Sequence, residues 1–479
     1  MQKSRQMSNT SYHLAIDLGA TSGRAVLASF DGEAITTEEI ARFKYPMMPL
    51  SGHLFWNLPR IYEEVLRSMK RAAEIAAERN MSLSSIGIDS WGCDVAYFYN
   101  DGAIAGLPYC YRDTHTTGAA EKFCSMFGKD RLYGKTGIQL MDFNTLFQLF
   151  TLRQNGAPVL DRADKILFIP DALAYMLTGN AVTEFTVAST SQMLNLETGD
   201  FDADLLAALG ISRDKFGPMV QPGTVIGHIN PDVSKATGLG NVPVVAVAGH
   251  DTASAVIGIP SPDSNCAYLS CGTWALLGIE TESHNAGEDA KRYNFTNEGG
   301  IHGKTRFLKN ICGMWIFERV RHELGLDNEN VATVAATCHD STCDTIINPD
   351  DPAFANPASM TEAIKNYCVD RGLECPTSTA DYTRVIFRSL AARVAEILGL
   401  LKGISPAPIE RLHVIGGGSL NSHLMKMLAQ TTGIPVVAGP SESTAIGNII
   451  VQIEGTRPGI TETELRSIAL KSSETITYK

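Results

Sequence analysis

The sequence predicts an α/β protein of two similar lobes, and three observations support this fold class. At 479 residues the chain exceeds what one hydrophobic core usually supports. Short apolar runs alternate with segments in which apolar residues recur at the period of a helix. A Gly and Thr/Ser turn between two apolar strands occurs near residue 20 and again near residue 272. This repetition suggests an internal duplication with one phosphate loop in each lobe.

The first lobe opens with a predicted β-hairpin. Residues 13–16 and 25–30 are apolar and flank a loop of Gly and Ser, and residues 38–45 can supply a third strand. The period then changes, with Asn57 as an N-cap and Pro59 in the first turn of an amphipathic helix. The apolar positions of this helix are Ile61, Val65, Met69, Ala73 and Ala76.

Strands and helices alternate through the rest of the chain. Residues 242–248 form an apolar run typical of a buried strand, and residues 267–269 and 274–279 form the second hairpin. The remaining predicted elements are strands at 85–89, 94–99 and 412–415 and helices at 385–401 and 420–430.

The boundary between the lobes should fall near residues 240–250. We therefore divide the chain into an N-terminal domain, a C-terminal domain and a C-terminal extension. Their predicted ranges are 11–245, 246–455 and 456–479.

Composition excludes several classes of function. The formal charge of -12 and the pI near 5.4 argue against a broad surface for nucleic acid, which needs clustered Lys and Arg. No run approaches the ~20 apolar residues of a membrane helix, and the start MQKSRQMSNTSYH lacks the apolar core of a signal peptide. We expect a cytoplasmic protein with neither a membrane nor a nucleic acid as partner.

The ten cysteines show no regular framework, as expected for reduced and mostly buried thiols. One group could be interpreted as a zinc cluster: Cys338, His339, Cys343, Cys368 and Cys375. Its CxxxxC and CxxxxxxC spacings miss the two-residue spacing of zinc knuckles. We therefore predict no metal-ligating cysteine.

Asp17 ends an apolar strand directly before a loop of small residues. Small residues let the backbone approach a phosphate, consecutive N–H groups can bind its oxygens, and the carboxylate can hold a hydrated Mg²⁺. The loop contains Gly19, Ala20, Thr21, Ser22, Gly23 and Arg24. An ordinary Asp-Leu-Gly turn without a ligand remains the alternative. No GxxxxGK[ST] motif is present here, which disfavours a P-loop NTPase.

Asp251 follows the apolar run at the expected N-terminus of a small-residue helix. The helix dipole favours an ionised carboxylate there, so Asp251 could accept a proton from an alcohol that attacks phosphorus. Asp is equally a preferred N-cap, and both interpretations stay open. The neighbouring His250 could bind a hydroxyl or could be a packed, hydrogen-bonded histidine.

Two further segments could form part of a site. Residues 416–418 are three glycines after a strand, which could let an adenine ring lie against the backbone or could form a plain turn. The segment IGIDSWGCD, residues 86–94, offers Trp91 to stack on a sugar and carboxylates to bind its hydroxyls. The alternative for this segment is a strand end with a core tryptophan.

Taken in this order, the motifs resemble the FGGY carbohydrate kinases of the actin, hexokinase and Hsp70 superfamily, and within them the bacterial rhamnulokinases. The similarity runs from about Tyr12 to Gly447. The motifs that carry it are AIDLGATSGR, IGIDSWGCD, GLPYCYRD, FNTLFQL, PDALAYMLTG, VAGHDTASAV, YLSCGTWALLG, TNEGG, LKNICGMW, HVIGGGSLN and STAIGN.

The resemblance implies two ribonuclease-H-like domains around a central cleft that closes on substrate, with ATP and Mg²⁺ as cofactors. It assigns Ala20 to Arg24 to the first phosphate loop and Thr273 to the second, and Asn310 and Gly417 to the ATP site. The implied sugar-site residues are Gly92, His250, Asp251 and Thr252, with Asp251 as the proton acceptor.

One position departs from the family pattern. Where rhamnulokinases commonly have Gln near the nucleotide, this chain has Glu318, and Arg319 could be its partner. An extra negative charge there could weaken ATP binding, so we leave Glu318 out of the site.

The resemblance implies transfer of the ATP γ-phosphoryl group to the 1-hydroxyl of L-rhamnulose. A kinase for L-fuculose or xylulose is the nearer alternative, and a catalytically silent sugar sensor is the more distant one. An Hsp70-like clamp would need a peptide-binding β-domain, for which the roughly thirty residues after Gly447 are too few. We expect a monomer or a homodimer.

Overall fold

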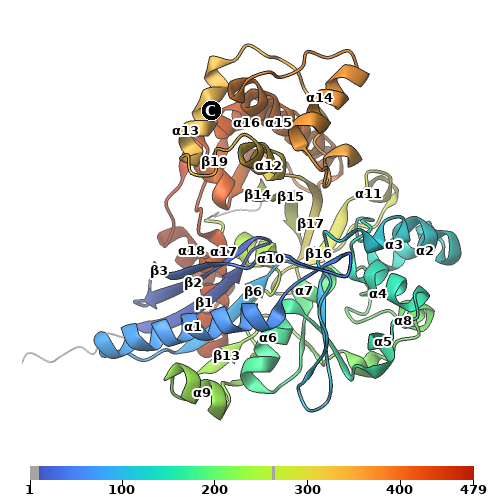
Figure 1. The fold of residues 1–479 in the computed structure, drawn as a ribbon. Coiled ribbons are helices and arrows are strands. Elements are labelled where there is room, and N and C mark those ends of the chain that lie inside the picture. Colours follow the sequence, from blue (N-terminus) through green and yellow to red (C-terminus); the bar gives the residue numbers. More distant parts are fainter. Residues whose placement is uncertain (1–9, 261–264) are drawn as a thin grey trace, which may run out of the picture.

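The computed structural model describes residues 10–260 and 265–479. It shows two lobes, one above the other in Figure 1. The lower lobe contains the N-terminal half of the chain together with the helices α17 and α18 near its C-terminus. The upper lobe contains most of residues 265–438.

A six-stranded sheet organises the lower lobe, in the order β12-β13-β6-β1-β2-β3. The hairpin β1–β2 continues antiparallel into β3, while β6 runs parallel to β1 and β13 runs parallel to β6. The strands are β1 (Ser11–Leu18), β2 (Ser22–Phe30), β3 (Ile35–Lys44), β6 (Ser85–Ser90), β12 (Val225–His228) and β13 (Pro243–Val245). The predicted hairpin, third strand and strand at 85–89 are confirmed.

The predicted strand at 242–248 is only partly present. Residues 242–248 are almost all buried, but only Pro243–Val245 belong to the sheet. The chain then leaves the sheet and returns beside the end of β6 through one isolated parallel bridge, where Ser90 N–H donates to Gly249 O at 2.9 Å. The apolar composition of this run reflects its burial and not strand structure along its whole length.

A seven-stranded sheet organises the upper lobe, in the order β16-β17-β15-β14-β18-β19-β20. Its stretch β17-β15-β14-β18-β19 repeats the order and strand directions of β3-β2-β1-β6-β13, with three antiparallel strands followed by parallel neighbours. The strands are β14 (Cys266–Cys271), β15 (Trp274–Thr281), β16 (Thr296–Gly299), β17 (Thr305–Cys312), β18 (Arg411–Ile415), β19 (Val436–Ala438) and β20 (Ile476–Tyr478). The repeated topology fits the predicted duplication.

Helices cover both faces of the lower sheet. Helix α1 (Leu58–Glu78) begins as predicted, because the Asn57 side chain accepts a hydrogen bond from Arg60 N–H and a proline lies in the first turn. It packs against strand residues such as Leu14 and Ile16. Residues on the opposite face, such as Ala15, pack against α17 (Ser443–Thr456), a helix from the far end of the sequence.

The upper lobe is mainly helical above its sheet. The longest helix, α15 (Thr379–Ile404), contains the predicted helix at 385–401 and starts earlier because Ser378 and Asp381 form a capping box. The predicted helix at 420–430 is α16 (Ser422–Thr432), preceded by the 3-10 turn Gly417–Leu420. The other helices of this lobe are α11 (Glu288–Arg292), α12 (Trp315–Glu323), α13 (Val331–Ala336) and α14 (Met360–Asp370).

Smaller elements complete the lower lobe. The strands are β4 (Met48–Leu50), β5 (His53–Phe55), β7 (Val95–Phe98), β8 (Ile104–Gly106), β9 (Lys165–Phe168), β10 (Thr183–Glu184) and β11 (Met219–Val220). The helices are α2 (Ala119–Phe127), α3 (Lys129–Thr136), α4 (Thr145–Gln154), α5 (Val159–Arg162), α6 (Ile169–Thr178), α7 (Phe185–Ser189), α8 (Ala203–Leu209), α9 (Pro231–Thr237) and α10 (Asp251–Ile257).

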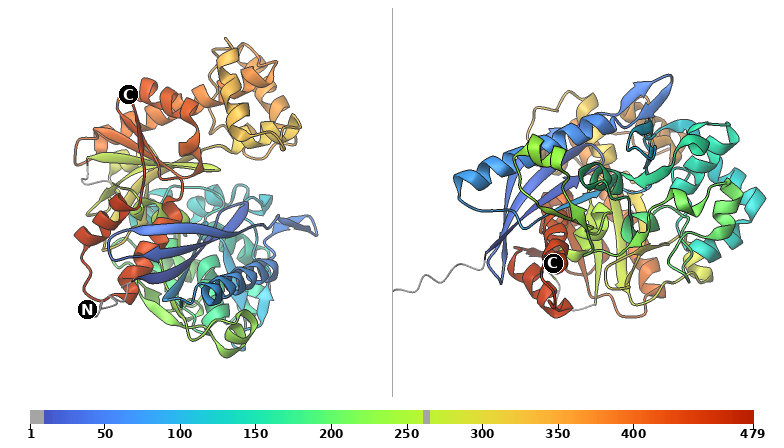
Figure 2. Two further views of the ribbon diagram at one scale, coloured as in Figure 1. Left: turned by 90° about the vertical axis from the view of Figure 1, so that its left-hand side faces the viewer. Right: turned by 90° about the horizontal axis from the view of Figure 1, so that it is seen from below.

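The C-terminal segment contacts both lobes. Helix α18 (Glu462–Lys471) packs beside α17 against the lower sheet, whereas β20 pairs with β19 at the edge of the upper sheet. Figure 2 shows these red helices with the lower lobe and the C-terminus in the upper lobe. Residues 456–479 are therefore packed onto the folded core.

In the described part of the chain, no helix combines the length and apolar character that crossing a membrane requires. Each of the ten cysteines is a free thiol in this structure.

Candidate functional site

A cleft of about 530 Å³ lies where the turns of the two sheets face one another. The β1–β2 turn contributes from the lower lobe, and the β14–β15 turn and the loop after β18 contribute from the upper lobe. All of the predicted site residues line it: Asp17, Ala20, Thr21, Ser22, Gly23, Arg24, Trp91, Gly92, His250, Asp251, Thr252, Thr273, Asn310 and Gly417.

Asp17 and Arg24 form an ion pair at the start of the first turn. They are opposite one another in the β1–β2 register, and Arg24 Nη2 lies 2.7 Å from Asp17 Oδ2. Arg24 also pairs with Glu442, which precedes α17. Burial alone would lower the pKa of Arg24, but the carboxylates of Asp17 and Glu442 raise it above its usual value. The first turn therefore has a fixed cation beside its acidic residue.

Asp251 is the first residue of α10 and reaches into the cleft, with 28% of its side chain exposed. His250, not Asp251, occupies the N-cap position. The Asp251 Oδ1 atom accepts a hydrogen bond from Thr252 N–H at 2.6 Å and lies 3.5 Å from His250 Nε2. Burial raises the pKa of Asp251, while His250 and the hydrogen bonds from Thr252 lower it and Asp17 raises it further. A carboxylate with a raised pKa is a stronger base than an ordinary Asp.

A buried ion pair holds His250 from behind. Its Nδ1 atom lies 3.2 Å from Glu298 Oε2 and 3.1 Å from Arg306 Nη2, and these two atoms are 3.1 Å apart. Glu298 on β16 and Arg306 on β17 are register partners and are 4% and 0% exposed. Burial would raise the pKa of Glu298, but Arg306 and His250 hold it below its usual value. With Nδ1 occupied in this way, Nε2 is the nitrogen that faces Asp251.

Sequence reasoning did not assign roles to Glu298 and Arg306. Glu298 lies in the motif TNEGG, but a glutamate in a short strand does not by itself indicate a buried partner. The signal that could have found the pair is the strand itself, because a charged Arg306 within a run of consecutive buried residues of β17 requires a buried partner.

The carboxylates of IGIDSWGCD do not line the cleft, which corrects the expectation that they bind sugar hydroxyls. Asp89 is 0% exposed and accepts a hydrogen bond from Asn448 Nδ2 at 2.6 Å. Burial, and to a smaller extent the negative charge of Asp17, raises the pKa of Asp89 well above its usual value. Asp94 is also 0% exposed. A fully buried carboxylate cannot reach a hydroxyl in the cleft.

Asp94 instead organises the wall of the cleft. Its Oδ2 atom accepts hydrogen bonds from the indole N–H groups of Trp56 at 2.6 Å and Trp91 at 2.9 Å. Burial raises the pKa of Asp94 to about 6, and these hydrogen bonds oppose that shift. Trp91 is 5% exposed and packs against Trp56 with ring centroids 4.3 Å apart. The indole that lines the cleft is thus held rigidly by its own N–H group.

The glycine loop after β18 has an open centre. Gly416 has φ +80°, and a Cβ at Gly418 would lie 2.4 Å from Cys271 Sγ, so backbone conformation and packing require both glycines. A Cβ at Gly417 would meet nothing within 4 Å. Packing within the protein therefore does not require glycine at 417, and the space beside it is free for a planar ligand.

Glu318 lies on α12 and is not part of the cleft wall. The suggestion that Arg319 pairs with Glu318 was wrong. The partner of Glu318 is Arg321, whose Nη1 atom lies 2.6 Å from Glu318 Oε2. Arg319 instead packs over Trp315 and donates to Pro357 O at 3.0 Å. Residues three apart on a helix are neighbours, which explains this pairing.

The cleft suits a hydrated divalent cation near Asp17. Its carboxylate oxygens are the hard ligands that Mg²⁺ prefers, and Asp17 and Asp251 are close enough to influence one another electrostatically. The buried Oδ1 of Asp89, behind Asp17, has no hydrogen-bond partner. Asp17 therefore presents the carboxylate that a hydrated cation in the cleft would meet, whereas the raised pKa of Asp89 argues against a second negative charge beside it.

Family comparison matches nearly the whole chain. Residues 12–258 match the N-terminal domain and residues 267–454 match the C-terminal domain of the FGGY family of carbohydrate kinases.

Two curated relatives are similar over most of their length. A rhamnulokinase from Bacteroides thetaiotaomicron is 49% identical, with 91% of this chain and 89% of the relative covered. A rhamnulokinase from Pectobacterium atrosepticum is 40% identical, with 92% of this chain and 87% of the relative covered.

Solved structures share the fold at low identity. The gluconate kinase from Lactobacillus acidophilus has a TM-score of 0.80 at 16% identity, with 98% of this chain and 94% of that chain covered. The Plasmodium falciparum glycerol kinase with ADP has a TM-score of 0.79 at 16% identity and the same coverage.

Proposed function

This chain belongs to the FGGY family of carbohydrate kinases, and we propose that it transfers the γ-phosphoryl group of ATP to the primary 1-hydroxyl of L-rhamnulose. The products are L-rhamnulose 1-phosphate and ADP, in the breakdown of L-rhamnose. The observation that carries this proposal is the position of Asp251, in a cleft lined by the glycine turns of both sheets.

Asp251 acts as the base in this mechanism. It accepts the proton of the 1-hydroxyl as the oxygen attacks the γ-phosphorus, and its raised pKa makes it a stronger base than an ordinary Asp. Gly92, His250, Thr252 and Trp91 bind and orient the sugar beside it.

The two turns hold the nucleotide. Backbone N–H groups of residues 20–24 and of the turn at Thr273 bind phosphate oxygens, and Arg24 adds a cation beside them. Asn310 and Gly417 line the rest of the ATP site, where the open side of Gly417 supports a close approach of adenine.

A bound Mg²⁺ would neutralise charge on the phosphate oxygens, and Asp17 would hold it through water. Closure of the lobes would exclude water, which otherwise competes with the sugar as acceptor.

We further propose that the chain divides at residues 245/246 and 455/456, close to the end of the lower sheet at Val245 and to the end of α17 at Thr456. In this division α17 belongs to the C-terminal domain by sequence although it packs on the lower sheet. We propose a monomer or a homodimer, and the cytoplasm, where ATP is supplied, as its location.

An ADP-release assay tests the proposal. Purified protein is offered L-rhamnulose, L-fuculose, L-xylulose, D-xylulose and glycerol, each with ATP. We expect the highest kcat/KM for L-rhamnulose. Preference for another sugar would overturn the substrate assignment and leave the kinase assignment intact. If no ADP is released with any of these sugars, a catalytically silent sugar sensor would be favoured.

A further inference from the structure

A cysteine and two histidines from distant segments meet in the upper lobe. Cys338 and His339 lie in the short 3-10 helix η3 (Thr337–Asp340), and His423 lies in the first turn of α16. The three potential ligand atoms all lie within 4.8 Å of one another. Within residues 10–260 and 265–479, they are the one group of three such side chains that meets this criterion.

The two histidines already contact one another through ring nitrogens. His339 Nε2 lies 2.6 Å from His423 Nδ1, with the rings nearly perpendicular at 70°. A metal ion bound by both rings would take the place of this contact between the two nitrogens.

Cys338 supplies a sulfur within the same 4.8 Å limit. It is 0% exposed and packs in the core of the upper lobe together with residues of α16 such as Leu424. Burial raises the pKa of its thiol, so a metal ion that binds here must displace the thiol proton. The position is protected from solvent on one side, while His339 remains exposed on the other.

We propose that Cys338, His339 and His423 form a zinc site that joins η3 to α16. One sulfur and two imidazole nitrogens suit Zn²⁺ and not Mg²⁺ or Ca²⁺, which prefer oxygen ligands. Tetrahedral zinc holds such ligand atoms roughly 3.3 to 3.6 Å apart, so the histidine nitrogens must separate by less than about 1 Å. The exposed side leaves the fourth position to water.

This site is separate from the cleft, since none of its residues lines the cleft. It differs from the cysteine pattern that sequence spacing excluded, because His423 lies 84 residues beyond His339. Helix α16 begins just after the glycine loop at residues 416–418. A metal ion would therefore hold in place the helix that directly follows the glycine loop of the cleft.

Metal binding is measured on the full-length protein after removal of metal by a chelator, with Zn²⁺ alone and with Co²⁺ alone. We expect one equivalent of Zn²⁺ to bind, with Co²⁺ giving a thiolate charge-transfer band and the visible spectrum of a tetrahedral ion. His423→Gln and Cys338→Ala should each weaken binding more than about 100-fold, beyond the 10- to 100-fold cost of losing a supporting group. His322→Gln and Cys375→Ser are the matched controls and should bind as the parent chain does.

The variants also separate folding from binding. His423 is only partly buried, so His423→Gln should keep the unfolding temperature of the metal-free protein, and Zn²⁺ should raise that temperature in the parent chain but not in this variant. Failure of the parent chain to bind Zn²⁺ would overturn the proposal. Binding that survives both substitutions, or Co²⁺ binding without a thiolate band, would also overturn it.

Discussion

At the residue scale, the base of the proposed reaction depends on its neighbours. Asp251 is part-buried, lies at the start of a helix and is adjacent to His250. The orientation of His250 in turn depends on a pair of buried charged side chains, Glu298 and Arg306. The proton acceptor, the sugar-binding histidine and its support therefore form one electrostatic unit. Changes in any of them should alter the pH dependence or the sugar affinity in a distinctive way.

Replacing His250 should move the acid limb of activity to higher pH. Ionised Asp251 is the active form, so activity is lost when pH falls below its pKa. Because burial raises this pKa, the loss begins at a higher pH than it would for an ordinary Asp. His250 lowers this pKa, and His250→Asn removes that effect. The pH profile of kcat/KM measures the shift. An unchanged or lower apparent pKa in the variant would show that His250 does not act on Asp251.

Glu298→Gln should impair sugar binding more than nucleotide binding. The substitution removes the negative charge beside His250 Nδ1 and weakens the constraint on the ring, while the phosphate turns are untouched. We expect KM for the sugar to rise about 10-fold, in the range of roughly 10- to 100-fold seen for groups that orient a ligand, with KM for ATP nearly unchanged. Glu318→Gln, an exposed change outside the cleft wall, is the control. Equal increases in both KM values would contradict a role in orienting His250.

The positions of site residues were predictable where small residues and carboxylates follow apolar strands. Asp17, the loop to Arg24, and Asp251 all line the cleft as expected. Asp89 and Asp94 were offered as sugar ligands with a plain strand end as the alternative, and the alternative holds, because a sequence shows which residues are polar but not which way a strand turns them. Their burial depends on Asn448, Trp56 and Gln148, which lie far away in the chain.

At the element scale, the crossing of α10 and α17 positions the base. The helices approach so closely that a Cβ on Gly447 would lie 1.8 Å from Ser254 O. Helix α10 carries Asp251, and α17 carries Asn448, which holds Asp89. This contact therefore links the catalytic carboxylate to the lower sheet.

Gly447→Ala should force these helices apart. Overpacking in a well-packed core costs about 1 to 3 kcal/mol, and a backbone clash at this distance should reach at least the upper end. Urea unfolding measures the loss, and turnover should fall as Asp251 moves. The control is Gly399→Ala on α15, where an added Cβ meets nothing within 4 Å and should stabilise the helix by up to about 1 kcal/mol. Equal stability of the two variants would contradict the role of this crossing.

Local periodicity predicted most elements, and non-local packing accounts for the failures. The hairpin β1–β2, helix α1 and helix α15 carry their own apolar spacing and caps. The strand predicted at 242–248 is longer than the observed one, because these residues are apolar as a result of burial and not of strand pairing. The pairing of β20 with β19 has no local signal at all, since only the tertiary fold brings these strands together.

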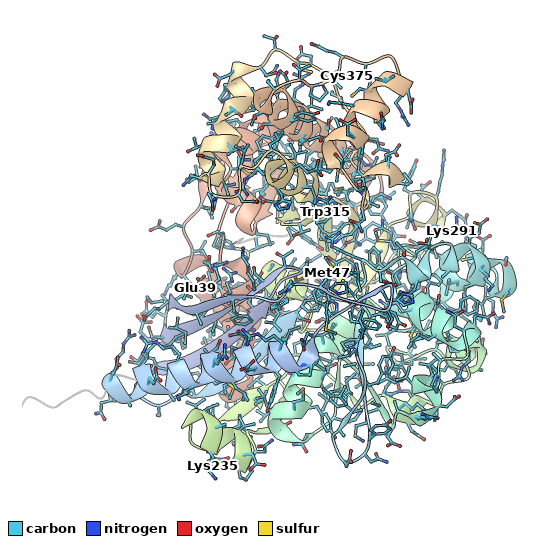
Figure 3. All side chains as sticks on the ribbon, viewed as in Figure 1. Glu39, Met47, Lys235, Lys291, Trp315 and Cys375 are labelled. Carbon is cyan, nitrogen blue, oxygen red and sulfur yellow. The ribbon has the colours of Figure 1, made fainter. Side chains whose placement is uncertain are left out.

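At the scale of the whole molecule, the two lobes are linked at several places around the cleft. The C-terminal segment packs on the lower sheet through α18 and joins the upper sheet through β20. Outside the cleft lining, the guanidinium of Arg112 lies 4.1 Å from the ring centroid of Trp315, which Figure 3 labels at the lower edge of the upper lobe. Closure on substrate should depend on such contacts between the lobes.

Trp315→Leu should favour the open arrangement. Loss of the cation–π contact present in this structure removes about 0.5 to 2 kcal/mol from the arrangement that has it, which corresponds to a roughly 2- to 30-fold rise in sugar KM if a more open arrangement lacks the contact. Small-angle scattering of the ligand-free protein should give a larger radius of gyration. Trp315→Phe retains a ring face and should lie between the variant and the parent chain. Identical scattering and KM in all three proteins would show that this contact does not bias closure.

The most direct test of the central claim is the turnover of Asp251→Asn with saturating L-rhamnulose and ATP. The amide cannot accept the hydroxyl proton, so we predict a loss of at least about 100-fold in kcat, the low end for general base catalysis, with sugar binding retained. Turnover close to that of the parent chain would remove Asp251 from the mechanism and contradict the account.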